Sequence, residues 1–155
     1  MLQASGELDF SPAEKTIRPG TKSEYGYRFD FGKRAVYLPV FRNQLPDIMS
    51  VFDFPNPNMP QGKRTASNIS PQSLFLMNSD FVRQRSQKTA ERVMTLAEET
   101  QQRIEWLTLT ILNRAPTDDE VQLFSQFIGD NGDSLDRWTQ VAQSLFGSLD
   151  FRFVD

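Results

Sequence analysis

The stretch QQRIEWLTLTILNR, from Gln101 to Arg114, decides the fold class because it is apolar on nearly every side of a helix. Its large apolar residues are Ile104, Trp106, Leu107, Leu109, Ile111 and Leu112. A helix that is apolar all round is buried among other elements, since none of its faces suits water. The stretch therefore predicts an inner helix of a helical bundle.

Two more helices are predicted downstream. Thr117 and Glu120 have the T-x-x-E spacing of a capping box, in which two side chains satisfy free amides at the start of a helix. IGDNGDS ends that helix, and the last helix is marked by Leu135, Trp138, Val141, Ala142, Leu145 and Phe146. The DNGD sequence hints at calcium, but the terminal Glu of an EF-hand loop is missing, so we interpret it as a turn.

One long helix is predicted upstream, from Ser70 as its N-cap and Pro71 at its first position to about Leu96 or Ala97. The stripe that we expect to be buried consists of Phe75, Asn78, Val82, Ser86, Val93 and Ala97. A second apolar face covers only the first half and consists of Leu74, Met77 and Phe81. We therefore expect the first half to be buried on two sides and the second half on one.

The residues before this helix predict an irregular arm. Residues 1–24 show no period and are interpreted as an irregular N-terminal segment. In YGYRFDFGKRAVYLPVF, aromatic residues alternate with small or charged ones over residues 25–31, which predicts a β-hairpin with a second strand at residues 35–38. LPDIMSVF, with Pro46 at the first helical position, predicts a short helix before a proline-rich loop.

These elements predict a mainly α fold: a bundle of about four helices with an N-terminal irregular arm that contains a short β-hairpin. A chain of 155 residues suits one domain, so residues 25–155 are expected to form a single helical domain with its arm.

Composition excludes several function classes. The 17 Lys and Arg against 20 Asp and Glu give a net charge of -3, so we expect no nucleic-acid partner. No apolar run approaches the roughly 20 residues that span a bilayer, so we expect a soluble chain without membrane insertion. The absence of Cys and His excludes thiolate chemistry, imidazole bases and ordinary haem ligation, and we predict neither a metal nor a cofactor in this chain.

The candidate site consists of six polar residues beside apolar anchors: Arg42, Asn43, Asp53, Arg64, Gln72 and Asn78. One interpretation is a structural network, in which Arg42 or Arg64 pairs with Asp53 and the amides hold carbonyls of the loop. The other is a binding or catalytic site, with Asp53 as base or oxygen ligand, the arginines as anion clamps and Asn43 as an orienting group. We favour the network, because a long loop needs partners for its backbone.

Two other groups of residues have structural interpretations. The basic strip of Arg83, Arg85, Lys88 and Arg92 is typical of a solvated helix face, because acidic residues lie close to it in the sequence. Both tryptophans occupy helical core positions, so we expect them to pack in the core rather than bind sugar.

Several motifs occur in a fixed order: RAVYLPVFRNQLPDIMSVFDFPNP, GKRTASNISPQSLFLMNSDFV, ILNRAPTDDE and WTQVAQSLFGSLDFRFVD. In this order they resemble the C-terminal half of the planctomycete-specific domain of unknown function 1553. The resemblance implies that the chain is the C-terminal part of a larger domain. It also implies that its partner is the missing N-terminal portion or another protein chain, and that the setting is exported or periplasmic. Related proteins often have haem-binding cysteines in an upstream region that is absent here.

Because the family has no established activity, two hypotheses follow. The first is a non-catalytic structural or interaction domain of a larger planctomycete-type exported protein. The alternative is the C-terminal part of a carboxylate-dependent hydrolase or of a carbohydrate-binding protein. Exposed aromatic rings at Tyr25, Tyr27 and Trp106 would favour carbohydrate binding.

Overall fold

The computed structural model of the chain describes residues 1–11, 32–37, 40–42, 45–60, 62, 69–129 and 132–153. Its described part is mainly helical, which confirms the predicted fold class. The chain forms two compact units. We call Met1–Glu7 with Leu76–Asp155 the helical unit, and Leu8–Phe75 the inserted unit.

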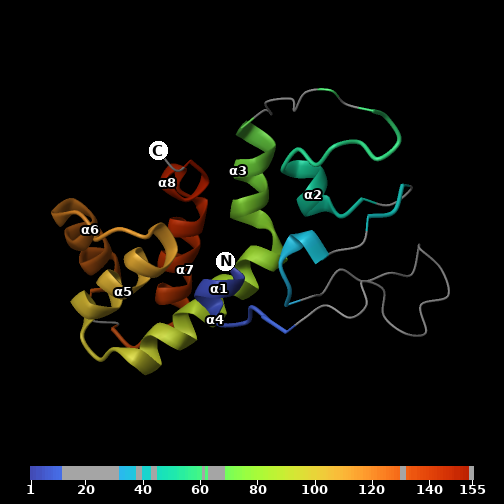
Figure 1. Cartoon of the computed structure of the whole chain (residues 1–155). Helices are drawn as coiled ribbons and strands as arrows, with labels where there is room; N and C mark the ends of the chain where they lie inside the picture. The colour runs from blue at the N-terminus through green and yellow to red at the C-terminus, as the bar shows by residue number, and fades with distance from the viewer. Residues whose placement is uncertain are drawn as a thin grey trace. The chain divides into compact units, whose positions relative to one another are not determined.

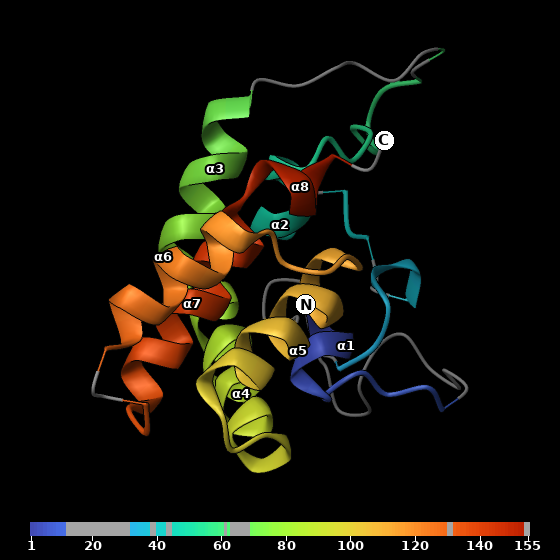
Figure 2. The ribbon, with the colours of Figure 1, turned by 90° about the vertical axis from the view of Figure 1, so that its left-hand side faces the viewer.

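The helical unit is a bundle built around two long helices, α4 (Asp80–Leu96) and α7 (Leu135–Gly147), which pack along each other (Figure 1). The other helices are α1 (Leu2–Ser5), α5 (Thr100–Leu112), α6 (Asp118–Ile128) and α8 (Leu149–Arg152). α1 lies on α4, and α5 contacts α4, α6, α7 and α8 (Figure 2). The largest fully buried side chains include Trp138, Phe146, Ile104, Leu107 and Ile128. The bundle and the core position of Trp138 are therefore as predicted.

Helix α5 is an inner helix on only part of its circumference. Ile104 and Leu107 are fully buried, whereas the Leu109 side chain is 58% exposed. The expectation of a helix buried on all sides is therefore wrong for the side that contains Leu109. Trp106 is only half-buried, unlike Trp138.

The predicted long helix is divided into two helices, α3 (Ile69–Asn78) and α4. Ser79 between them has extended backbone angles, and its Oγ accepts a hydrogen bond from the Phe81 amide at 3.2 Å. Ser79 is thus a second N-cap, followed by the acidic Asp80 in the first turn of α4. The prediction of one continuous helix from Ser70 is therefore wrong.

This division also changes which side chains are buried. Val82, Ser86 and Val93 are buried as predicted, because they belong to one continuous helix. Asn78 is exposed, so its predicted place on the buried stripe is wrong. The physical reason is that a 100° step per residue relates two positions only while the helix is unbroken. Leu74 and Met77 are also exposed, at 60% and 64%, so the predicted second buried face is wrong.

The inserted unit contains α2 (Asp47–Val51), close to the bounds predicted for LPDIMSVF, with Pro46 one residue before the helix. Residues Ala35–Tyr37 form a 3₁₀ helix, so the second strand predicted at 35–38 is wrong where it is described. The first predicted strand, at residues 25–31, lies outside the described residues. Phe52 contacts Phe75 edge to face, with ring centroids 5.9 Å apart. In the described ranges, no helix is both long and apolar enough to cross a membrane.

Candidate functional site

The predicted polar constellation is divided between the two units. Arg42, Asp53 and Gln72 belong to the inserted unit, and Asn78 belongs to the helical unit. The other two members, Asn43 and Arg64, lie outside the described residues. The Arg42 side chain is exposed, and its carbonyl accepts a hydrogen bond from the side-chain amide of Asn58 at 3.0 Å. The ion pair of Arg42 or Arg64 with Asp53 stays a prediction.

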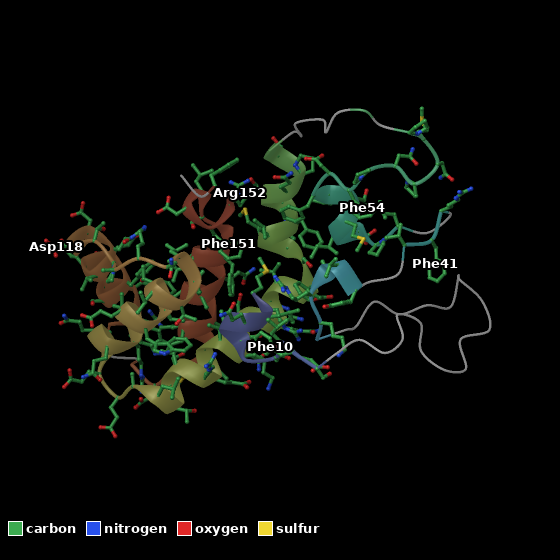
Figure 3. The ribbon with its side chains drawn as sticks, viewed as in Figure 1. Phe10, Phe41, Phe54, Asp118, Phe151 and Arg152 are labelled. Carbon is green, nitrogen blue, oxygen red and sulfur yellow. The ribbon has the colours of Figure 1, made fainter. Side chains whose placement is uncertain are left out.

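Asp53 has a backbone role that the sequence did not indicate. Its φ of 58° places it in the left-handed region immediately after α2, where a residue reverses the chain. The Phe54 amide then reaches back to the Met49 carbonyl at 2.9 Å, which satisfies a free carbonyl at the helix end. Phe54 lies beside α2 as a result (Figure 3). Asp tolerates this conformation better than most residues with a Cβ atom.

The helical unit contains a charged cluster around Arg114, which the sequence analysis did not select. The C-cap of α5 is Asn113, whose φ of 57° is left-handed and whose amide donates to the Leu109 carbonyl at 3.0 Å. The chain therefore turns directly after α5, and Arg114 is the first residue beyond the turn. The segment NRAPT then leads into α6.

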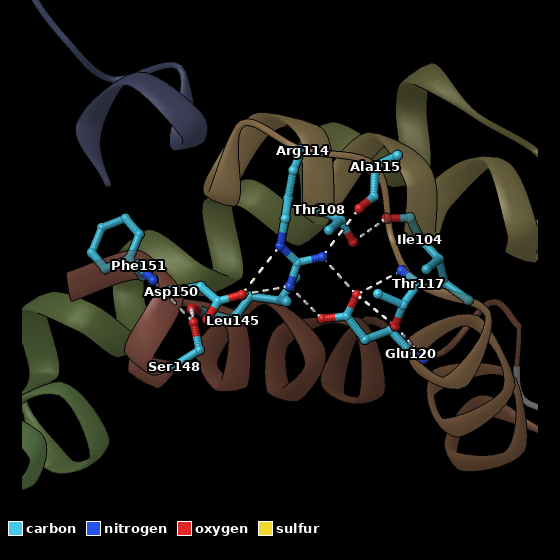
Figure 4. A network of polar contacts seen from close by, with 10 residues as sticks. All are labelled: Ile104, Thr108, Arg114, Ala115, Thr117, Glu120, Leu145, Ser148, Asp150 and Phe151. Atoms are coloured by element: carbon cyan, nitrogen blue, oxygen red, sulfur yellow. Dashed lines mark hydrogen bonds and ion pairs between the residues drawn. The ribbon is translucent and has the colours of Figure 1, made fainter. Parts of the chain in front are cut away.

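Arg114 contacts two carboxylates and one carbonyl (Figure 4). Its Nη1 and Nη2 donate to Oε2 and Oε1 of Glu120 at 2.8 and 2.7 Å. Its Nε and Nη2 donate to Oδ2 of Asp150 at 3.1 and 2.6 Å, and Nη1 also donates to the Ala115 carbonyl at 3.1 Å. A guanidinium has five N–H donors. All five are engaged by groups of this chain.

Glu120 takes part in both the capping box of α6 and the ion pair with Arg114. The capping box is confirmed: the Glu120 amide donates to Thr117 Oγ1 at 3.3 Å, and the Thr117 amide donates to Glu120 Oε2 at 2.8 Å. The hydrogen bonds from Arg114, with a smaller contribution from the Thr117 amide, lower the pKa of Glu120 to about 2. The same contacts with Glu120 and Asp150 raise the pKa of Arg114.

Asp150 connects this cluster to the C-terminal helix. It lies in the first turn of α8, whose N-cap Ser148 accepts a hydrogen bond from the Phe151 amide at 3.2 Å. The Phe151 ring packs edge to face on the buried Phe146 of α7, with centroids 5.2 Å apart. Arg114 therefore ties together the end of α5, the start of α6 and α8.

The cluster is suited to holding structure rather than to acid–base chemistry. A general acid or base works best with a pKa near the operating pH, and the pKa of Glu120 is far below neutrality. An anion clamp needs N–H donors that point to an open position, and those of Arg114 point to protein oxygens. The sequence did contain a signal for this pair: the R-x-P-T-x-x-E pattern places an arginine six residues before the capping glutamate.

A second charged cluster lies near the N-terminal end of the inserted unit. The Lys33 ammonium lies 2.8 Å from Asp9 Oδ2, and it donates to the carbonyl and hydroxyl oxygens of Ser11 at 2.9 and 2.7 Å. The Lys33 contacts lower the pKa of Asp9 well below its ordinary value, with help from Ser11. A lysine that activates a serine must accept its proton, whereas Lys33 donates to Ser11 here.

A third cluster holds the loop between α6 and α7. The buried Arg103 of α5 donates to the Ala97 carbonyl at 2.9 Å and also to the Gly132 carbonyl. The Trp138 indole N–H donates to the same Gly132 carbonyl at 2.7 Å. The DNGD sequence thus supplies a carbonyl to two protein donors, which supports the turn interpretation over a calcium loop. Asp130 and Asn131 lie outside the described residues.

The basic strip on α4 is only partly a solvated face. Lys88 pairs with Glu91 at 2.7 Å and Arg83 with Asp80 at 3.1 Å, both on the exposed side. Arg85 is largely covered and pairs with Glu7, so the solvated-face interpretation is wrong for this residue. Arg92 is exposed, as that interpretation expects, although it also donates to carbonyls of the α1 segment. Among the side chains that the structure describes, no three carboxylates gather as a metal-binding group.

Comparison with family models places the chain in a known family. The model described as protein of unknown function (DUF1553) matches residues 1–128, and the chain belongs to this family. The match includes the arm, α1 to α6 and the ILNRAPTDDE motif with both Arg114 and Glu120. Comparisons with curated proteins and with solved structures found no match.

Proposed function

We propose that the chain is a structural and interaction domain, not catalytic by itself, within a larger exported protein of the planctomycete type. Its partner in this proposal is a further N-terminal portion of that protein or another protein chain. The exported setting rests on the resemblance in sequence, and the structural role rests on the charged clusters.

The observation that carries the proposal is that all the N–H donors of Arg114 are used within the chain. Its five N–H groups all donate to oxygens of Glu120, Asp150 and Ala115. Catalytic and binding sites hold polar groups that point at a position for the ligand. Here the arginine that stands in the family-matched region uses its whole donor set to join three helical segments.

The alternatives have less support. A carbohydrate site needs open aromatic faces, but Trp138 is fully buried and the Arg92 guanidinium lies 5.3 Å from the Trp106 ring centroid. A hydrolase would use Asp53, whose left-handed backbone already explains its place after α2. Exposed apolar side chains on the helical unit support an association role, and these are Met77, Leu96, Leu109, Leu123, Leu149 and Phe153.

The test combines turnover with folding. The purified full chain is assayed against chromogenic glycosides and esters, and Asp53→Asn and Arg114→Gln are assayed at the same concentration of folded protein. We expect no turnover above a heat-denatured sample, with Arg114→Gln changing only the free energy of unfolding. Turnover by the wild type that Asp53→Asn abolishes while the circular dichroism spectrum is unchanged would establish the hydrolase instead.

A further inference from the structure

The α1 segment is bound to α4 in the manner of a short peptide on a receptor surface. α1 has four residues, and residues 8–75 separate it in sequence from the remainder of the helical unit. An isolated helix of this length is unstable in water, because nucleation costs more than a single turn returns. Its contacts with α4 therefore stabilise the helical conformation of α1.

Arg92 of α4 caps the C-terminal end of α1. Its Nη1 donates to the carbonyls of Gln3 and Ala4 at 3.2 and 3.1 Å. These carbonyls belong to the last turn of the helix, where a positive charge is favoured by the helix dipole. The Trp106 ring lies 5.3 Å from the Arg92 guanidinium, which holds the cation in position.

Two further features define what the surface accepts. Gly6 ends the helix with a φ of 76°, which glycine adopts without strain, and the Glu7 amide returns to the Leu2 carbonyl at 3.0 Å. This turn brings Glu7 Oε2 to 2.8 Å from Arg85 Nε, an ion pair in which both side chains are largely covered. Ala4 and Ser5 are buried, so small side chains face the bundle.

We propose that the surface formed by Arg85 and Arg92 of α4 and Trp106 of α5, which we call the α1 seat, is a recognition site that also takes the α1 segment of a second copy of the chain. The chemistry that it recognises is a one-turn helix with small buried residues, a C-terminal glycine and a following carboxylate. The proposal deepens the interaction role proposed above and rests on it.

A second copy is the occupant because it brings the identical segment. The hydrogen bonds of Arg92 and the ion pair of Arg85 are made to residues 3–7, so the same interactions form whether this segment comes from the same molecule or from another. Exchange of an identical element between protomers is a low-cost route to a dimer. The seat is therefore a reciprocal interface: each copy supplies one segment and one seat.

A charge-reversal experiment tests this directly. In the full chain, Glu7→Arg opposes Arg85 within the same molecule, and Arg85→Glu opposes Glu7 in the same way. When the two variants are mixed, the new arginine at position 7 of one variant can pair with the new glutamate at position 85 of the other, and Glu7 of the second can pair with Arg85 of the first. We expect either variant alone to be monomeric in sedimentation velocity and the equimolar mixture to form a one-to-one dimer, with an affinity roughly tenfold or more above either self-association.

Two controls keep the result decisive. The double variant E7R/R85E restores an opposite-charge pair within one chain, and we expect it to sediment as the wild-type chain does in the same experiment. Fluorescent LQASGE, blocked at both ends, should bind the Glu7→Arg chain and lose roughly tenfold in affinity when Arg92→Ala is added to that chain. Arg83→Ala is the matched control, since Arg83 pairs with Asp80 on the exposed side of α4.

The outcomes separate the two proposals. A mixture that stays monomeric, or a peptide that binds equally with and without Arg92→Ala, overturns the α1 seat as a site for a second copy. Neither result bears on turnover, so the structural role proposed above would stand or fall on its own assay.

Discussion

Arg114 and Glu120 face each other as a parallel fork, with Nη1 2.8 Å from Oε2 and Nη2 2.7 Å from Oε1. The pair spans the turn between α5 and α6, and Asp150 extends it to α8. A fork of this kind fixes the direction of both side chains as well as their distance. The ILNRAPTDDE motif therefore specifies how α5 and α6 meet, and Asp150 from outside the motif adds α8.

The first prediction concerns the shape of the cation. Arg114→Lys keeps the charge but cannot supply five donors in one plane, so we expect it to lower the free energy of unfolding by about 1–3 kcal/mol. Urea unfolding followed by circular dichroism measures the change. Arg83→Lys is the control, because the exposed Arg83–Asp80 pair should be within about 0.5 kcal/mol of the wild type. Equal effects of the two substitutions would contradict the role assigned to Arg114.

The second prediction concerns acid. The pKa of Glu120 is about 2 in the folded chain against an ordinary value of 4.5, so folding favours the ionised form. Its contribution is complete above pH 4.5 and is lost as the pH falls towards 2. We expect Glu120→Gln to lower stability by about 1–3 kcal/mol at pH 7, with the difference from wild type shrinking in that window. Asp119→Asn, exposed on the same turn, is the matched control and should stay within about 0.5 kcal/mol of the wild type at pH 7.

The sequence predicted this cluster only in part, for a physical reason. The capping box is local, so three residues of spacing were enough to find Thr117 and Glu120. The partnership of Arg114 with Asp150 spans 36 residues, and it depends on how the last helix packs. Periodicity within one helix contains no information about such a contact.

The division at Ser79 illustrates a second limit. A serine followed by an acidic residue can begin a helix, but it is also tolerated within one, so the pattern alone allowed both outcomes. The apolar period continues from Phe75 to Val82 across the division, which favoured one long helix. The exposed positions of Met77 and Asn78 follow from the new helix start and could not be read from the period.

The third prediction separates the backbone of Asp53 from its carboxylate. With a φ of 58°, this position favours Gly and tolerates Asn, but a β-branched residue is strained there. We expect Asp53→Gly and Asp53→Asn to change the free energy of unfolding by less than about 1 kcal/mol, and Asp53→Val to lower it by about 1–2 kcal/mol or more. Thermal unfolding of the three variants measures this. A loss with Asn as large as with Val would instead identify an ion pair of the carboxylate, as predicted with Arg42 or Arg64.

The last prediction concerns the loop between α6 and α7, where Arg103 and Trp138 donate to one carbonyl, that of Gly132. Trp138→Phe removes the indole N–H but keeps most of the apolar volume, and we expect it to cost about 1–3 kcal/mol. Arg103→Met removes the other donor. Either single variant leaves the carbonyl with one partner, whereas the double variant leaves it with neither. The double variant should therefore cost more than the sum of the two single variants, by about 0.5–1.5 kcal/mol in a double-mutant cycle of urea unfolding. A carbonyl that loses its last hydrogen-bond partner carries an added free-energy penalty. If the free-energy costs of the two single variants simply add up in the double variant, the two donors act on the loop independently, and the role assigned to the shared carbonyl is contradicted.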